Sequence, residues 1–365
     1  MKIGIYARGL SVKSGGVTRY IFGLVSALLR EISETETVYI IHNLKKNVFD
    51  EEKENVKEIL MRSNSRVFCD FVLAPRIING AKFDVVLFTK NVIPFFVHSK
   101  KIVTIHDLAY YFPKFRAYKF SDTKYMKFMI KRSCFAADKI IAVSENTKND
   151  LLSLFNIPPS KIETVYEAAD DGYKKIDDKQ KLENIRRKYE LDRKFIFYPG
   201  NISPRKNIER LINAFEKVQD KIDLDLVLTG HNMWNSHKEI GMIKKNRRIK
   251  LLGCIPDEDL PSIYNIAEAF VYVSLYEGFG IPIVEAQRCG CPVIVSDSAS
   301  LPEVAGKGAI VVDPYDEGEI TRAILQVVED RSTREKVIQE GYKNAERFSW
   351  KKSAKETIEL IRGVC

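Results

Sequence analysis

Short apolar runs of strand length alternate with longer amphipathic stretches along most of the chain. In the first half the runs predict strands at Lys2 to Tyr6, Val38 to Ile41, Val85 to Phe88, Ile102 to Ile105, Ile140 to Val143 and Ile162 to Val165. Stretches with helical spacing follow at Thr18 to Ile32, Asp122 to Ala136 and Glu145 to Phe155. Strands that alternate with helices indicate parallel sheets covered by helices.

The alternation breaks once, at the polar segment DDGYKKIDDKQK of residues 170–181, which is typical of a linker. It then resumes with predicted strands at Phe195 to Tyr198, Leu224 to Leu228, Ile249 to Leu252, Phe270 to Val273, Val293 to Val295 and Ala309 to Val312. We therefore predict an α/β protein of two doubly wound domains, residues 1–175 and 176–349. Such domains bind ligands beyond the carboxyl ends of their strands, so we expect a ligand cleft between them.

The length and composition agree with two folded domains. The chain has 365 residues, more than one hydrophobic core usually organises, and 45% of them are hydrophobic. Its first residues, MKIGIYARGL, fit a first strand better than a signal peptide, and no apolar run is long enough to span a membrane. Six scattered cysteines without a CxxC pair favour reduced thiols and a cytoplasmic location.

The net charge of +9 is unevenly distributed. Residues 1–182 contain 30 Lys and Arg against 21 Asp and Glu, whereas residues 183–365 contain 28 of each class. The excess in the first half suggests an anionic partner, such as a membrane surface, a phosphate-bearing acceptor or a nucleic acid. A lysine-rich solubilising surface is the alternative interpretation.

The segment YVSLYEGFGIPIVEAQRCGC, residues 272–291, carries the strongest chemical signal. A buried strand ends near Glu277, and the loop from Gly278 to Gly280 leads into a helix with Pro282 in its first turn. Glycines allow a ligand close to the backbone, and the amides of a helix start attract anions. Glu285, about one turn into the helix, can share the face of Glu277. The segment predicts a diphosphate site, although a structural loop with a solvated glutamate would look similar.

Three further segments are candidates. In YPGNISPRKNIERLINAF, residues 198–215, Arg205 and Lys206 follow a strand and can hold phosphate oxygens. The loop RGLSVKSGG, residues 8–16, suits close passage of a phosphate or sugar, or is simply a flexible turn. His106 and Asp107 follow another strand and can orient a hydroxyl or move a proton, unless Asp107 only caps a helix. No set of residues has metal-site spacing.

Taken together, these segments resemble family 4 of the GT-B glycosyltransferases, retaining enzymes that use nucleotide-sugar donors. The resemblance spans the chain and rests on six features: Gly15 and Gly16, His106 and Asp107, VSENTKNDL from Val143, the segment from Gly200 to Asn207, the Glu277 and Glu285 pair, and the terminal FSW of residues 348–350. It implies a final helix, residues 350–365, that returns to the N-terminal domain. It also implies that the N-terminal domain binds the acceptor and the second domain binds the donor.

The resemblance assigns roles to individual residues. It implies catalytic roles for Glu277, His106, Arg205 and Lys206. Donor contacts would come from Gly15, Gly16, Asn201, Arg205, Lys206, Gly278, Phe279, Gly280, Ile281 and Glu285, and acceptor contacts from Asp107 and Tyr110. No metal or cofactor besides the donor is expected. The family often has a glycine after the strand ending at Val165, where this chain has YEAAD, residues 166–170. The resemblance therefore does not define the wall of the site that this segment would form.

Rival classes fit the sequence less well. A retaining glycosidase also needs two carboxylates but has no use for Arg205 and Lys206. The third glycine of a dinucleotide fingerprint is missing after Gly280, and no P-loop motif occurs. A non-catalytic protein that binds nucleotide sugars would share the fold and stays an alternative.

The donor and acceptor can be predicted only by class. The family likeness slightly favours GDP-mannose over a UDP-sugar, with transfer of a mannose- or glucose-type hexose. The stretch YKFSDTKYMKFMIKR, residues 118–132, and the basic first half suggest docking on an anionic membrane and a glycan or lipid-linked acceptor in polysaccharide or glycolipid synthesis. An ordinary packed helix is the alternative for that stretch. Nucleic acid is disfavoured because no recognition motif accompanies the charge.

Overall fold

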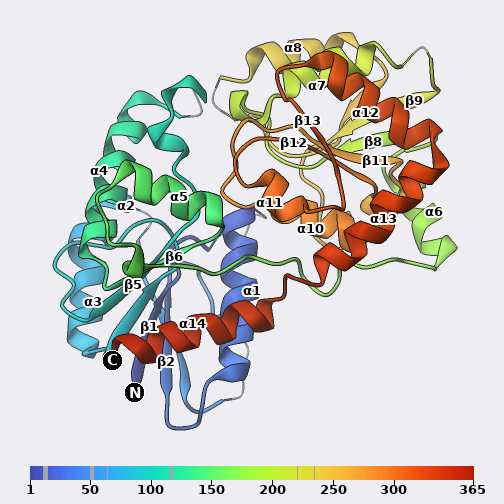
Figure 1. The fold of residues 1–365 in the computed structure, drawn as a ribbon. Helices are drawn as coiled ribbons and strands as arrows, with labels where there is room; N and C mark the ends of the chain where they lie inside the picture. The colour runs from blue at the N-terminus through green and yellow to red at the C-terminus, as the bar shows by residue number, and fades with distance from the viewer. Residues whose placement is uncertain (11–14, 50–52, 64, 116–117, 220, 234) are drawn as a thin grey trace. The chain divides into compact units, whose positions relative to one another are not determined.

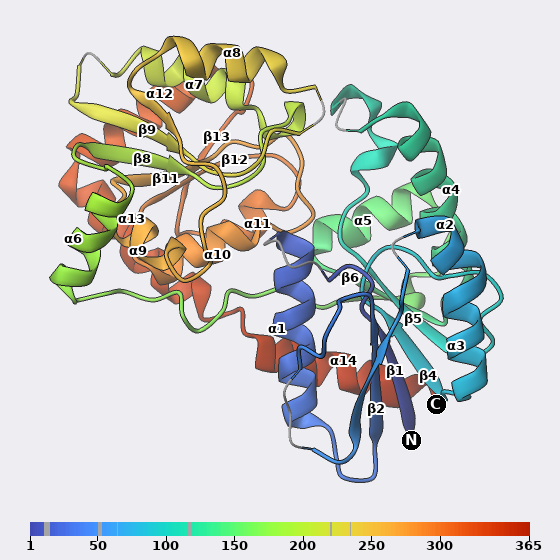
Figure 2. The ribbon, with the colours of Figure 1, turned by 180° about the vertical axis from the view of Figure 1, so that it is seen from behind.

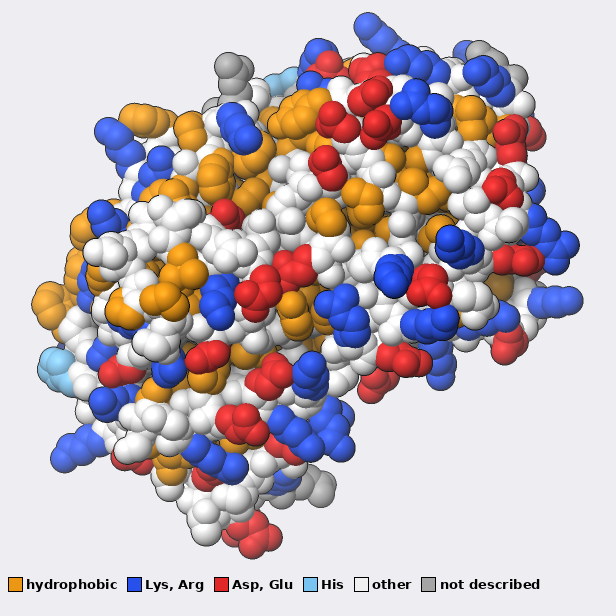
Figure 3. Space-filling view, in the orientation of Figure 1, with side chains coloured by type: hydrophobic (Ala, Val, Ile, Leu, Met, Phe, Trp, Pro, Cys, Tyr) orange, Lys and Arg blue, Asp and Glu red, His pale blue; other side chains and the backbone are white. Residues whose placement is uncertain are grey.

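The computed structural model describes residues 1–365 apart from 11–14, 50–52, 64, 116–117, 220 and 234. The chain forms two compact units (Figure 1). Unit 1 comprises residues 1–108, 121–168 and 349–365, and unit 2 comprises residues 109–120 and 169–348. Among the described helices, none is both long and apolar enough to cross a membrane. Charged side chains of both signs are spread over the face drawn in Figure 3.

Unit 1 is built on a seven-stranded sheet in the order β3-β2-β1-β4-β5-β6-β7, with every neighbouring pair parallel. Its strands are β1 (Lys2–Tyr6), β2 (Thr37–His42), β3 (Val56–Leu60), β4 (Val85–Phe88), β5 (Lys100–Ile105), β6 (Lys139–Ala142) and β7 (Ile162–Thr164). Its helical segments are α1 (Gly16–Glu31), α2 (Arg66–Phe68), η1 (Cys69–Leu73), α3 (Ala74–Ala81), α4 (Phe120–Ala136), α5 (Glu145–Leu154), η4 (Pro159–Lys161) and α14 (Trp350–Val364). α1 and α14 cover one face of the sheet, and α3 and α4 lie on its other side (Figures 1 and 2).

The C-terminal helix α14 is part of the core of unit 1. Ala354, Ile358 and Ile361 pack into the same apolar cluster as α1, β1 and β2. The two helices approach closely at Gly23 of α1, where an added Cβ would lie 2.2 Å from the ring of Trp350. Glycine is therefore the residue that this contact requires.

Unit 2 is built on a six-stranded parallel sheet in the order β10-β9-β8-β11-β12-β13. Its strands are β8 (Lys194–Tyr198), β9 (Leu224–Leu228), β10 (Ile249–Leu251), β11 (Ala269–Tyr272), β12 (Val293–Ser296) and β13 (Ile310–Val312). Its helical segments are η2 (Ala109–Tyr111), η3 (Pro113–Phe115), α6 (Lys179–Lys188), η5 (Pro204–Lys206), α7 (Ile208–Glu216), α8 (His237–Lys245), α9 (Leu260–Ile266), α10 (Ile281–Arg288), α11 (Leu301–Ala305), α12 (Glu317–Glu329) and α13 (Arg331–Ala345). The predicted fold class of two parallel α/β sheets is thus confirmed.

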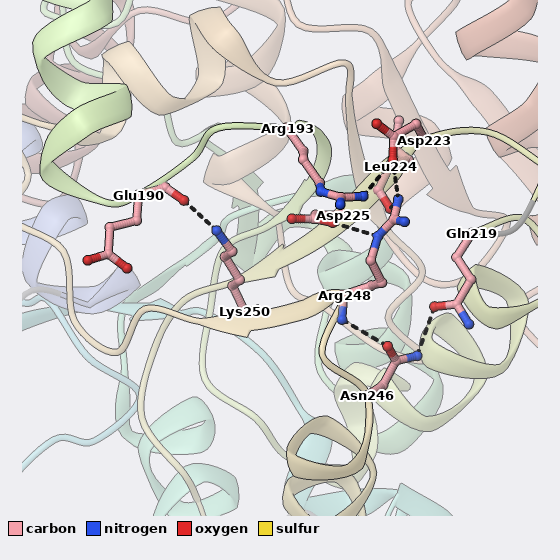
Figure 4. Close-up of polar contacts among 9 residues, drawn as sticks. All are labelled: Glu190, Arg193, Gln219, Asp223, Leu224, Asp225, Asn246, Arg248 and Lys250. Carbon is pink, nitrogen blue, oxygen red and sulfur yellow. Dashed lines mark hydrogen bonds and ion pairs between the residues drawn. The ribbon is translucent and has the colours of Figure 1, made fainter.

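Ion pairs anchor the edge of this second sheet. Arg248, just before the edge strand β10, donates from Nε to Asp225 at 2.8 Å and from Nη2 to Asp223 at 3.0 Å (Figure 4). Lys250, within β10, donates to the carbonyl oxygen of Glu190. These side chains fix the short strand to the chain segments beside it.

The boundaries between the units differ from the sequence-based ones in two places. The chain enters unit 2 after Ala168 rather than after residue 175, and the predicted linker runs into α6 at Lys179 because Asp178 caps that helix. The segment 109–120 belongs to unit 2, although it lies within the predicted first domain. The reason is aromatic packing, since the rings of Phe112 and Phe115 lie 5.0 and 5.5 Å from that of Tyr276.

Candidate functional site

The strand order of unit 2 places the predicted site at a topological switch point. From β8 the chain proceeds outward through β9 and β10, then returns to add β11 on the other side of β8. The loops that follow β8 and β11 therefore diverge, which leaves room for a ligand at the carboxyl ends of these strands. Arg205 and Lys206 follow β8 and Glu277 follows β11, so the fold brings the predicted cations and carboxylate together.

The loop after β8 has a backbone that only a few residue types allow. Gly200 has φ 134°, and a Cβ on Gly230 would lie 2.4 Å from the carbonyl oxygen of Gly200. Asn207 has φ 61°, and its side-chain amide donates to the carbonyls of Val273 at 3.0 Å and Pro314 at 2.7 Å. Asparagine tolerates this left-handed conformation, and its amide ties the start of α7 to the segment after β11.

Two cations surround one buried carboxylate in this loop pair. Arg205 Nη1 donates to Glu277 Oε2 at 3.0 Å and to the carbonyl oxygen of Tyr276 at 2.9 Å. Lys206 Nζ donates to Glu277 Oε1 and, at 2.6 Å, to the hydroxyl of Tyr272. The Glu277 side chain is 8% exposed, that of Lys206 11% and that of Arg205 17%. The cluster therefore brings two cations together in a poorly hydrated place, where charges act strongly on one another and on a bound anion.

The charges of the cluster set the protonation of Glu277. Burial alone would raise the pKa of this carboxyl, but the charges of Arg205 and Lys206 outweigh burial and lower the pKa from 4.5 to about 2. Glu277 is therefore a carboxylate at neutral pH. Burial and the nearby charge of Glu277 raise the pKa of Tyr272 well above 10, so its hydroxyl keeps its proton.

The glycine loop is held by a serine that sequence reasoning missed. Ser300 Oγ donates to the carbonyls of Glu277 at 3.0 Å and Phe279 at 2.9 Å. Gly280 has φ 106° and immediately precedes Ile281, the first residue of α10, and no side chain among the described residues caps this helix. Because Ser300 fixes the loop carbonyls, the loop from Gly278 to Gly280 has a defined shape at the start of a helix, as an anion site requires.

Glu285, the second glutamate of the pair, is 1% exposed on α10. Its Oε2 accepts a hydrogen bond of 2.8 Å from the hydroxyl of Tyr264 on α9. Asn201 is exposed, and its side-chain oxygen accepts from the backbone amide of His231 at 3.0 Å. Both residues lie in unit 2, and each has a defined contact within that unit.

In unit 1, His106 lies in a buried polar network beyond β5. Its Nδ1 is 2.9 Å from Glu167 Oε1, and its Nε2 is 2.9 Å from the carbonyl oxygen of Thr89. Its backbone amide donates to Asn91 at 2.8 Å, and the ring of Tyr20 packs edge-on at 4.6 Å. A carbonyl oxygen can only accept, so Nε2 carries a proton. Both ring nitrogens are engaged within the unit.

Glu167 is the main residue of this network that we did not predict. It belongs to the YEAAD segment, where the chain departs from the family pattern, and it is 6% exposed. A carboxylate directly after the parallel strand β7 lies at the same sheet edge as His106 after β5. The position of Glu167 shortly after a strand of the same parallel sheet was therefore the signal in the sequence that could have identified it.

The remaining predicted residues are distributed over both units. Gly15 and Gly16 are exposed at the start of α1, and part of their loop, residues 11–14, lies outside the described residues. Asp107 is partly exposed in unit 1. Tyr110 belongs to unit 2, where its ring stacks on Tyr118 at 3.9 Å. Over the described part of the chain, no three His, Cys, Asp or Glu side chains gather as metal ligands.

Comparison with known proteins identifies relatives over both units. The family model for glycosyl transferases group 1 matches residues 181–344, and that for glycosyltransferase family 4 matches residues 14–172. O-antigen chain mannosyltransferase B of Escherichia coli is 35% identical over 274 residues, which are 72% of this chain and 70% of that protein. The serotype-specific mannosyltransferase WbdA of Escherichia coli is 28% identical over 233 residues, 61% of this chain but 28% of that longer protein.

The fold also has solved counterparts. The crystal structure of Anabaena HepE in complex with UDP-glucose superposes with a TM-score of 0.74 over 100% of both chains, at 17% identity. At this low identity the likeness concerns the fold alone.

Proposed function

Since the chain belongs to glycosyltransferase family 4 and is a glycosyltransferase, we propose that it moves a hexose from a nucleotide-diphosphate sugar to a glycan or lipid-linked acceptor. The product would be part of a polysaccharide or glycolipid. We assign donor binding mainly to unit 2 and acceptor binding mainly to unit 1, with single contacts from the other unit in each case.

One observation carries the donor assignment. Arg205 and Lys206 lie side by side at the switch point of unit 2, where both contact the buried carboxylate of Glu277. Cleavage of the bond between the anomeric carbon and the diphosphate builds negative charge on the leaving group. We infer that the two cations, together with the amides of Gly278 to Gly280, would stabilise that charge.

Glu277 would act as a fixed anion rather than as a proton donor. A carboxyl group with a pKa of about 2 holds no proton at neutral pH, so general acid catalysis by this residue is unfavourable. Its charge would instead orient the two cations and favour the positive charge that develops on the sugar. We propose retention by attack on the same face of the sugar, with the leaving phosphate oxygen taking the acceptor proton.

We assign His106 an orienting role in unit 1. Glu167 and Thr89 hold its two ring nitrogens, so a proton transfer to substrate would first have to break one of these contacts. The network gives the ring one orientation, against which a sugar or acceptor can be placed. Asp107 and Tyr110 stay candidates for acceptor contacts, and Gly15 and Gly16 for donor contacts.

We propose mannose as the transferred sugar and GDP-mannose as the favoured donor. The support comes from the two Escherichia coli relatives, which are both mannosyltransferases. A UDP-sugar is the second candidate, because HepE was crystallised with UDP-glucose. We propose that no metal ion is required, and that the enzyme works in the cytoplasm on the inner face of a membrane.

The test combines binding and turnover. A thermal-shift panel of GDP, UDP, ADP and their sugars should show one stabilising series, because a ligand of the folded state raises the melting temperature. Slow release of free sugar from that donor, in the presence of EDTA, should be lost in Arg205→Ala and Glu277→Ala. Arg193→Ala is the matched control, since Arg193 pairs with Asp223 on the surface.

Three results would overturn parts of the proposal. Absence of both stabilisation and sugar release with every donor at millimolar concentration would refute it. Wild-type rates in Arg205→Ala would remove the cation cluster from the site. Inverted anomeric configuration of the transferred sugar, measured by nuclear magnetic resonance, would refute retention.

A further inference from the structure

Unit 1 carries an exposed apolar surface that none of the proposed chemistry uses. It consists of Val67, Phe68, Phe71 and Val72 on α2 and η1, Phe96 in the loop before β5, and Phe128 and Phe135 on α4. These side chains are between 38% and 66% exposed. We call this set the phenylalanine patch. Large apolar side chains gathered on a surface mark a binding face more often than isolated ones do.

The patch is one surface because its three segments are tied together. The ring of Phe95 stacks on Phe71 at 4.3 Å and lies parallel to Phe128 at 6.4 Å. The backbone amide of Phe95 donates to the carbonyl of Asp70 in η1 at 3.0 Å. Arg132 of α4 donates to the carbonyl of Ile93 at 2.9 Å and places its guanidinium 3.9 Å from the Phe95 ring centre. The central ring and the loop backbone therefore hold η1 and α4 in place.

Phe96 is presented to solvent by a specific backbone conformation. Its φ is 58°, a left-handed value that is rare for a bulky residue, and its side chain is 66% exposed. Asn79 of α3 holds the loop, because its amide donates to the Phe96 carbonyl at 2.7 Å and its oxygen accepts from the backbone amide of His98 at 3.2 Å. An exposed phenylalanine fixed in an unfavourable conformation indicates a functional constraint.

Basic side chains alternate with the aromatic ones on the outer face of α4. Lys124, Phe128, Lys131 and Phe135 are exposed and are spaced four, three and four residues apart, so they share one face of the helix. The whole helix contains four basic residues and one acidic residue, Asp122. Figure 3 shows orange side chains with blue ones among them along the edge of unit 1 where α4 lies.

We propose that the phenylalanine patch docks unit 1 onto a bilayer that contains anionic lipids. The phenylalanine rings would enter the region between headgroups and acyl chains, while lysine stems reach outward and place their ammonium groups at lipid phosphates. The positive charge favours an anionic lipid over a second copy of this chain, because two copies would bring the same cations together. The proposal rests on the proposed function in one respect, since a lipid-linked acceptor gives such docking its purpose.

The experiment uses flotation of the full chain with vesicles of phosphatidylcholine alone or with about 30% phosphatidylglycerol, which gives the vesicles a negative surface potential. Binding is expected only with the anionic vesicles, and it should weaken as salt rises. Phe96→Asn with Phe128→Ser should reduce the bound fraction at least tenfold; asparagine suits the left-handed backbone at position 96. Lys124→Glu with Lys131→Glu should abolish binding.

Two control variants test whether position matters. Val311→Ser removes an apolar side chain, 43% exposed, from β13 of unit 2. Lys351→Glu with Lys355→Glu makes the same charge change on α14. Both should float as the wild type does. An equal loss of vesicle binding in the control variants would overturn the proposal, and so would a wild type that does not float at low salt. A concentration-dependent dimer that the patch variants abolish would also overturn it.

The readouts separate this proposal from that of the function. Release of free sugar from a soluble donor needs no membrane, so the patch variants should keep that rate. A variant that fails to float but retains donor turnover leaves the catalytic assignment intact. A variant that floats normally but loses turnover tests the cation cluster and not the phenylalanine patch.

Discussion

The buried carboxylate of Glu277 should give unit 2 an acid-sensitive stability. The charges of Arg205 and Lys206 lower its pKa from 4.5 to about 2 although burial opposes the shift. At 1.36 kcal/mol for each pH unit, this difference corresponds to about 3 kcal/mol of stability. Because the folded-state pKa lies below its ordinary value, the stability is fully present above about pH 5 and is lost as the pH falls from 4.5 toward 2. Glu277→Gln removes the titration.

Urea unfolding followed by circular dichroism between pH 3 and pH 7 measures this effect. The stability difference between wild type and Glu277→Gln should be largest at neutral pH and should shrink by most of the 3 kcal/mol at pH 3. Hydrogen exchange in peptides of β8 and β11 assigns the change to unit 2. A difference that stays constant over this range would refute the reasoning.

A second carboxylate provides a control with the opposite sign. Burial raises the pKa of Glu356 on α14, so its charged form is unfavourable in the folded state. Glu356→Gln should therefore be slightly more stable than the wild type at neutral pH, and that gain should vanish as the pH falls. A parallel trend for both variants would point to a general acid effect rather than to the local charges.

Further variants test catalysis and packing. Arg205→Ala should lower the rate of donor cleavage about a hundredfold or more while the circular dichroism spectrum is unchanged, because one stabilising donor of the leaving group is lost. Gly23→Ala should destabilise unit 1 by about 1–3 kcal/mol, since the new methyl group meets Trp350, whereas Gly80→Ala, with no atom within 4 Å, should leave the melting temperature unchanged or higher. Glu167→Ala should reduce turnover more than Glu167→Gln, which keeps a hydrogen-bonding group beside the imidazole; equal rates in both would contradict the orienting role.

The central strands of both sheets were predictable because they are buried on both faces. β1, β4 and β9 were predicted with the boundaries that the structure has, and the resemblance to family 4 glycosyltransferases is confirmed. The edge strand β3 was missed because its sequence, VKEIL, is only partly buried and its polar residues hide the pattern. The helix α3 was also missed, because its eight residues are too few for a helical period to stand out in the sequence.

The residues of the donor cluster could be predicted from the sequence, but the contacts between them could not. The sequence indicated Arg205, Lys206 and Glu277 near a phosphate, yet nothing in the spacing showed that the two cations would hold the carboxylate itself. Glu167 was not paired with His106 because the two residues are 61 positions apart in the sequence, although both follow strands of one parallel sheet. The phenylalanine patch lay partly outside the stretch we had singled out, since its members come from three separate segments.

The inclusion of α14 in the first core has a consequence for biosynthesis. A ribosome completes residues 169–348 before it makes the helix that buries Ala354, Ile358 and Ile361 against α1. All residues of unit 2 are thus synthesised before unit 1 is complete. Until α14 is made, the apolar residues of unit 1 that this helix covers stay exposed in the nascent chain. A chain that lacked α14 would leave the apolar residues of α1 that this helix covers exposed to water.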